Sequence, residues 1–122
     1  MKENTGKCRW FIPDAFYPVI DHGEEYVSHE AVCVLNTTDQ DAHIQITLYF
    51  EDRDPIGGFE AICGAQRTNH IRMDRIVSKR GMRIPRGVPY AMTVESDTPV
   101  VVQYSRLDTT QADMSFMGLL AY

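Results

Sequence analysis

Hydrophobic and polar residues alternate one by one along much of this chain. The clearest example is the segment 42–50, in which one side is apolar: Ile44, Ile46, Leu48 and Phe50. The other side carries His43, Gln45, Thr47 and Tyr49. A period of two is typical of a β-strand with one face in the core and one face in water. The pattern therefore predicts a half-buried strand.

Six further segments have strand-like patterns: 8–12, 26–35, 58–63, 68–73, 90–95 and 99–105. In 26–35 the residues of one parity are Val27, Ala31, Cys33 and Leu35. Residues that favour turns separate the segments, at 36–41, 54–58, 85–87 and 96–99. Short strands with a turn about every 8–12 residues predict an all-β fold. We expect an antiparallel β-sandwich of about 7–8 strands, jelly-roll or immunoglobulin-like.

Two segments have an ambiguous pattern. Residues 100–102 are three valines, which indicates a strand that is central in the fold or covered by another chain. The segment 109–122 is rich in apolar residues. It fits either a short C-terminal helical turn near Thr110 or a last strand over 116–122, because Gly118 interrupts a helix. We expect it to dock on a neighbouring segment or subunit.

Size and charge exclude several classes of protein. The chain has 122 residues, which predicts a single domain over 1–122. Its formal net charge of −5 argues against a nucleic-acid-binding protein. No apolar run approaches the ~20 residues of a membrane helix, and Pro13 ends the first one too early for a signal peptide. Three scattered cysteines form no C-x-x-C pair. We therefore expect a cytoplasmic protein that is not inserted in a membrane.

Positive charge is concentrated in residues 67–86, which hold seven basic residues and one acidic residue. The rest of the chain holds five basic and sixteen acidic residues. Such a segment is typical of a solvated loop or of one that pairs with acids on a neighbouring subunit. It contains no aromatic residue, which argues further against binding of single-stranded nucleic acid.

Polar residues that interrupt apolar strands are the candidates for a binding site, because a buried charge is costly unless it is paired. They are Trp10, His29, Glu30, Asn36, Arg67, His70, Arg72, Gln103 and Arg106. Taken singly, each also fits a structural role, such as an exposed ion pair or a packing residue. Neighbouring residues of a strand face opposite ways, so His29 and Glu30 reach one cavity only if a bulge intervenes.

No catalytic motif is present: the chain lacks G-x-S-x-G, H-E-x-x-H and a glycine-rich phosphate loop. His29, Glu30 and His70 would form a metal set or an acid–base pair only if the fold brought them together. We expect no enzymatic activity and no cofactor.

Several short motifs resemble those of the sensory rhodopsin transducer family. After Trp10 they are SHEAVCVLN at 28–36, AHIQIT at 42–47, YFEDR at 49–53, PIG at 55–57, RTNHIR at 67–72, PVVVQ at 99–103, RLD at 106–108 and QA at 111–112. They occur in order, and the resemblance spans about residues 8–122. The chain departs from it between Asp74 and Arg86, where this sequence is rich in arginine.

The resemblance implies a cytoplasmic β-sandwich that assembles as a homotetramer. It also implies a non-catalytic sensory module that binds a small polar molecule, such as a sugar or a sugar-derived compound, through the nine candidate residues. Hydrogen-bonding side chains and an indole face suit a polyol. Two alternatives remain: an adaptor that relays the signal of a membrane receptor such as a sensory rhodopsin, and a small sugar-modifying enzyme.

Overall fold

The computed structural model describes residues 6–18, 29–108 and 115–121. These residues form seven strands and no helix: β1 (Lys7–Phe16), β2 (His29–Asn36), β3 (Ala42–Phe50), β4 (Ile56–Cys63), β5 (Arg67–Arg72), β6 (Pro89–Asp108) and β7 (Ser115–Leu120). Every pair of hydrogen-bonded strands is antiparallel. The expected all-β antiparallel fold is confirmed.

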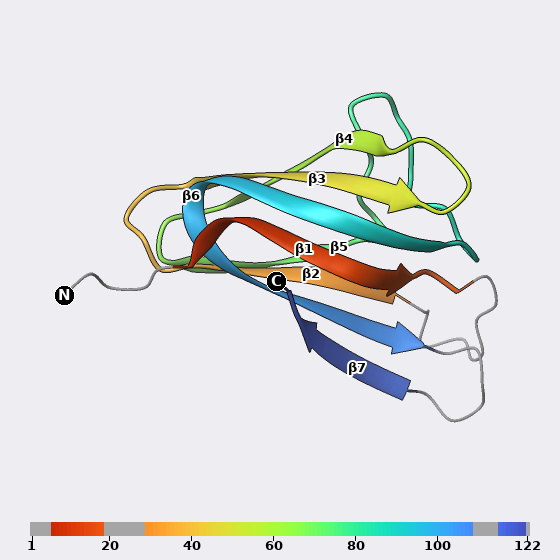
Figure 1. The fold of residues 1–122 in the computed structure, drawn as a ribbon. Coiled ribbons are helices and arrows are strands. Elements are labelled where there is room, and N and C mark those ends of the chain that lie inside the picture. Colours follow the sequence, from red (N-terminus) through yellow and green to blue (C-terminus); the bar gives the residue numbers. More distant parts are fainter. Residues whose placement is uncertain (1–5, 19–28, 109–114, 122) are drawn as a thin grey trace.

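The long strand β6 organises the fold (Figure 1). Its first half lies between β1 and β3, and β4 follows at the edge beyond β3. Its second half lies between β2 and β7, and β5 follows beyond β2. Hydrogen bonds therefore connect all seven strands into one curled sheet. We call its two parts the β1–β3–β4 half and the β2–β5–β7 half.

Contacts at the bend of β6 fix its shape. The Ser96 hydroxyl donates to the carbonyl of Thr98 (2.6 Å), and the Thr98 hydroxyl donates to the carbonyl of Asp41 (3.3 Å). Asp97 accepts hydrogen bonds from the backbone N–H and the ring of His43. Gly6, at φ +108°, approaches Val100 so closely that a Cβ atom would lie 2.0 Å from its carbonyl oxygen. These contacts turn one strand from one half of the sheet into the other.

The core lies between the two halves. Alternate residues of β3 fill it as predicted, since Ile44, Ile46 and Leu48 are fully buried. In β2 Val32 and Val34 are fully buried, whereas on the other parity Ala31 is 7% exposed, Cys33 is half-buried and Leu35 is 46% exposed. The parity that carries Ala31, Cys33 and Leu35 is therefore the outer face of β2. The sequence did not decide between the two parities, because each carries both apolar and polar residues.

Three expectations need correction. Segments 90–95 and 99–105 belong to one strand, β6, because the expected turn at 96–99 only bends it. The β4 strand begins at Ile56, inside the expected turn. We expected the two sheets of a jelly-roll or immunoglobulin-like sandwich, but β6 joins both halves into one sheet.

The C-terminal segment pairs as a last strand, since β7 lies antiparallel to the second half of β6. The alternative helical turn near Thr110 falls outside the described residues, as do residues 26–28 of the predicted second strand.

Candidate functional site

The nine candidate residues lie on two faces of the curled sheet and do not meet in one cavity. Trp10, Glu30, Asn36 and Arg106 share the core-facing parity of their strands, as does Arg67, which is exposed at the edge. The outer face of the β2–β5–β7 half carries His29, His70, Arg72 and Gln103. No bulge brings His29 and Glu30 to the same side, because their pairing with Leu107 and Arg106 is regular. The expected single pocket is therefore divided.

Glu30 is a buried carboxyl group that links distant strands. It is 1% exposed and accepts hydrogen bonds from the hydroxyls of Tyr90 (2.8 Å) and Tyr104, and from the backbone N–H of Phe16 (3.2 Å). Burial raises the pKa of Glu30, although these donors and the charge of Arg106 oppose the shift. The group joins β1, β2 and both halves of β6, which is a structural role.

Asn36 also has a structural role, about 20 Å from Glu30 along β2. Its side-chain amide N–H groups donate to three carbonyls, those of Gln40 (2.7 Å), Cys63 (3.1 Å) and Gly64 (3.2 Å). Its carbonyl oxygen accepts from the backbone N–H and the hydroxyl of Thr38. The side chain is fully buried and makes every hydrogen bond that an amide can make. It has no capacity left for a ligand.

Trp10 belongs to the packing of β1 rather than to an open binding surface. The indole N–H donates to the carbonyls of Val100 (2.9 Å) and Lys7 (3.1 Å), and the ring packs against the core. The ammonium group of Lys7 lies 4.3 Å from the ring centroid. The half-buried ring therefore supports the bend of β6.

His70 and Gln103 are the candidates that the fold brings together. Both flank Cys33 in the cross-strand register, on the outer face of the β2–β5–β7 half. With Leu35, Thr68 and Val101, among others, they line a shallow groove of about 290 Å³. We call this the histidine groove. Arg72 lies outside it, because its guanidinium forms two hydrogen bonds with Asp74 (2.8 and 2.9 Å).

The described part of the chain shows no cluster of side chains that could hold a metal ion. There, no three histidine, cysteine, aspartate or glutamate side chains come together as a metal site requires. His29 and Glu30 are on opposite faces of β2, so they do not form the metal set that the sequence allowed.

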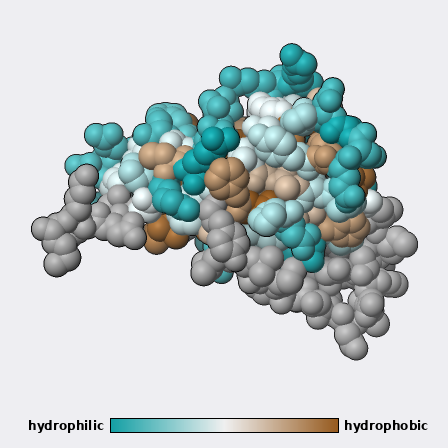
Figure 2. Space-filling view, in the orientation of Figure 1, coloured by the Kyte–Doolittle hydropathy of each residue, from teal (hydrophilic) through white to brown (hydrophobic). Residues whose placement is uncertain are grey.

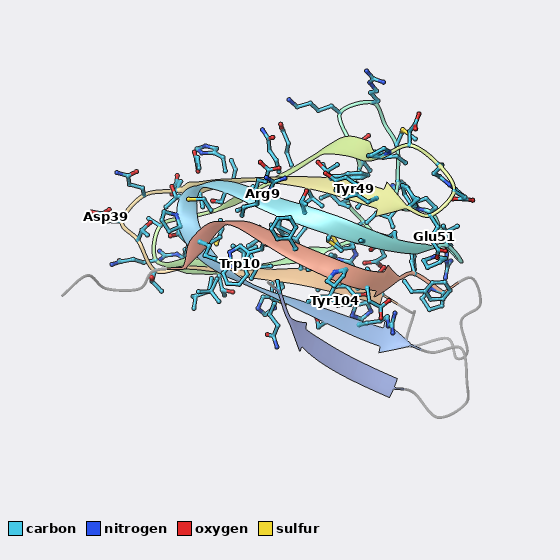
Figure 3. The ribbon with its side chains drawn as sticks, viewed as in Figure 1. Arg9, Trp10, Asp39, Tyr49, Glu51 and Tyr104 are labelled. Carbon is cyan, nitrogen blue, oxygen red and sulfur yellow. The ribbon has the colours of Figure 1, made fainter. Side chains whose placement is uncertain are left out.

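A second groove, which was not predicted from the sequence, lies on the outer face of the β1–β3–β4 half. It measures about 330 Å³ and is lined by Arg9, Phe11, Ile12, Pro13, Tyr49, Ala91, Met92 and Thr93. Phe11 is 47% exposed and Tyr49 is 39% exposed. Arg9 and Tyr49 lie on the viewed side of the sheet, with Glu51 beyond Tyr49 (Figure 3). Figure 2 shows hydrophobic side chains in the middle of this face, surrounded by hydrophilic ones. We call this the aromatic groove.

Thr93 contributes an unsatisfied polar atom to the aromatic groove. The residue is 5% exposed, and its hydroxyl has no hydrogen-bond partner among the described residues. A buried hydroxyl without a partner destabilises the fold by about 1–3 kcal/mol. One feature of the sequence could have indicated the aromatic groove. In the alternating segment 42–50, Tyr49 lies on the polar side, so its aromatic ring is expected at the surface rather than in the core.

Replacing Thr93 by valine is expected to stabilise the isolated protein by about 1 kcal/mol, because the shape stays and the unsatisfied hydroxyl goes. Urea denaturation measures this change. Thr47→Val is the control, since Thr47 lies beside Thr93 on β3 and is half-buried. A Thr93→Val variant less stable than the wild type would show that the hydroxyl has a partner in solution.

A family model described as Anabaena sensory rhodopsin transducer matches residues 5–122. The chain belongs to the Anabaena sensory rhodopsin transducer family. The sequence resemblance is thus confirmed. No curated protein matches the chain in sequence.

Two solved structures are similar to this family member. The crystal structure of Thermotoga maritima 1070 is 37% identical, covers 96% of this chain and 94% of its own, and superposes with a TM-score of 0.85. The Anabaena sensory rhodopsin transducer is 33% identical, covers 84% of this chain and 99% of its own, and has a TM-score of 0.74. Among the described residues, no helix is long and apolar enough to cross a membrane.

Proposed function

We propose that this chain is a non-catalytic cytoplasmic adaptor that relays the state of a membrane receptor of the sensory rhodopsin type. The observation that carries the proposal is the similarity to the Anabaena sensory rhodopsin transducer over nearly the whole of that protein. Membership of the family over residues 5–122 supports it.

The aromatic groove is the docking surface that we propose for the receptor. Exposed aromatic side chains in a partly desolvated pocket are the usual anchors of protein interfaces. Phe11 and Tyr49, which are 47% and 39% exposed, supply them. A neighbouring groove of about 420 Å³, which shares Pro13 and Tyr49, adds the carboxylates of Asp14 and Glu51. Cytoplasmic loops of membrane proteins are rich in lysine and arginine, so these two carboxylates are complementary to them.

Binding to Anabaena sensory rhodopsin in non-ionic detergent tests the proposal. Truncating both anchors, as Phe11→Ala with Tyr49→Ala, is expected to weaken binding at least 30-fold, because interface anchors contribute about 1–2 kcal/mol or more each. The matched control is Leu35→Ala with Val101→Ala, since these residues are 46% and 39% exposed on the other half. Isothermal titration calorimetry measures the dissociation constants.

Two results would contradict this proposal. If the Anabaena transducer binds and this chain does not, the partner is not a receptor of this type. If the chain binds and both double variants lose affinity equally, the receptor does not dock at the aromatic groove.

A second candidate function, the binding of a small sugar-like ligand by a homotetramer, has the histidine groove in its favour. His70, Gln103 and Thr68 offer hydrogen bonds beside the apolar walls of Leu35 and Val101, the mixture that polyol sites use.

At 100 times its dissociation constant, a ligand stabilises the fold by about 2.7 kcal/mol. A panel of sugars and sugar acids should therefore raise the melting temperature of the wild type. The rise should vanish in His70→Ala with Gln103→Ala and persist in the control Gln45→Ala; no rise with any compound removes the support for this function.

A further inference from the structure

We propose that the loop between β5 and β6 binds an anionic lipid surface through its tip, residues 75–83. We call residues 73–88 the basic loop. This inference rests on the proposed function, because an adaptor that is bound to a membrane receptor lies beside lipid headgroups. The tip also falls within residues 74–86, where the sequence departs from the family resemblance.

The basic loop is anchored at its base and closed at its tip. Met73 and Ile84 are buried, and Ile76 packs against the core. At the tip, Ser78 accepts a hydrogen bond from the backbone N–H of Gly81 (2.9 Å), and its hydroxyl accepts one from that of Met82 (3.0 Å). Gly81 has φ +80°, which favours glycine at this turn. The loop therefore presents its outward side chains from a defined position.

Those outward side chains combine charge with apolar surface. Val77 and Met82 are large apolar residues that are 42% and 43% exposed, and they stand among charged side chains. Arg75, Arg80 and Arg83 are exposed and make no ion pair with any described residue. Binding to a membrane interface has two contributions: apolar side chains enter the headgroup region, and basic residues are attracted to anionic lipids. The tip of the basic loop offers both kinds of side chain.

The charge of the rest of the chain does not prevent this binding. Outside residues 67–86 the formal charge is strongly negative, but charges interact over only about 8–10 Å in physiological salt. The basic loop projects beyond β4 at one end of the molecule, with nitrogen-tipped side chains extending from it (Figures 1 and 3). At this end Lys79 is paired with Glu60 of β4 (2.9 Å), which leaves Arg75, Arg80 and Arg83 to meet an anionic surface.

The exposed apolar pair favours lipid over nucleic acid as the anionic partner. Phosphate binding to DNA needs basic residues alone, and binding of single strands needs aromatic residues for stacking. The basic loop has no aromatic residue, and Val77 and Met82 would stay in water on a DNA backbone. Both side chains lose contact with water in the interface of a bilayer.

Sedimentation with protein-free vesicles at 0.1 M KCl tests the inference. The wild type is expected to bind vesicles of 70% phosphatidylcholine and 30% phosphatidylserine, and to bind pure phosphatidylcholine at least tenfold more weakly. One basic residue at an anionic surface contributes about fivefold in affinity. Arg80→Glu with Arg83→Glu should therefore weaken binding at least 25-fold. The control Arg9→Glu with Arg53→Glu changes the net charge equally and should weaken it less than threefold.

The apolar part of the tip has its own measurement. Val77→Ser with Met82→Ser keeps every charge and should weaken vesicle binding at least threefold. An interaction with double-stranded DNA would instead be unchanged by this substitution. The inference is overturned if phosphatidylserine vesicles do not bind, if both charge-reversal variants lose affinity equally, or if only DNA binds. Because these vesicles hold no receptor and the receptor titration holds no bilayer, failure here is distinct from failure of the proposed function.

Discussion

Replacing Glu30 by leucine is expected to lower the free energy of unfolding by about 3–5 kcal/mol. Leucine fits the apolar surroundings but accepts no hydrogen bond. The hydroxyls of Tyr90 and Tyr104 and the N–H of Phe16 would each lose an acceptor, at about 1–3 kcal/mol for a buried donor. Burial and the neighbouring carboxylate raise the pKa of both tyrosines, so they keep their protons and need that acceptor. Urea denaturation at pH 7 measures the loss.

The pH dependence of the free energy of unfolding tests the ionisation of Glu30 separately from the loss of its hydrogen bonds. The pKa of Glu30 is raised in the folded protein, so the folded state binds its proton more tightly than the unfolded state. Its contribution to stability is therefore greatest below the unfolded pKa, about 4.3, and is lost as the pH rises through the folded pKa. In Glu30→Gln this contribution is absent. The stability of the wild type relative to Glu30→Gln should accordingly decrease as the pH rises from 4.

Two outcomes would contradict this account of Glu30. A Glu30→Leu variant as stable as the wild type would show that the tyrosines find other partners. A wild type that gains stability over Glu30→Gln as the pH rises would mean that the carboxyl group has a lowered pKa in the folded state.

The sequence was informative about this fold where one face of a strand is clearly polar. The alternation in β3 identified both the strand and its buried side, because water and core select opposite residues at each step. It was uninformative where both parities of a strand mix apolar and polar residues, as in β2. The 96–99 turn was also misplaced, because its residues make hydrogen bonds that bend β6 without ending it. Residues that favour turns do not by themselves show whether a strand bends or ends.

The candidate site shows the same limit. Polar residues inside apolar strands were correctly seen as unusual, but Glu30 and Asn36 are satisfied within the fold, at opposite ends of one strand. Only the cross-strand register of β5, β2 and β6 places His70 near Gln103. The aromatic groove combines β1, β3 and β6 in the same way, so it depends on pairings between residues far apart in the chain.

Replacing Asn36 by aspartate is expected to lower the free energy of unfolding by about 3–5 kcal/mol at pH 7, although the two side chains have the same shape. Three carbonyl oxygens, those of Gln40, Cys63 and Gly64, now receive hydrogen bonds from the amide. A carboxylate has no hydrogen to donate, so it would face these oxygens as a buried charge. Urea denaturation measures the change.

Acid should partly rescue this variant, because a protonated aspartate can donate to one of the carbonyls and carries no charge. The matched control is Asn69→Asp. The Asn69 amide donates to the carbonyl of Ile62 (2.9 Å) in an exposed hydrogen bond, so water can replace it, and the expected loss is at most about 1 kcal/mol. Equal losses in the two variants would contradict the role of Asn36, because the prediction depends on its burial between the 36–41 turn and the end of β4, and not on the loss of an amide as such.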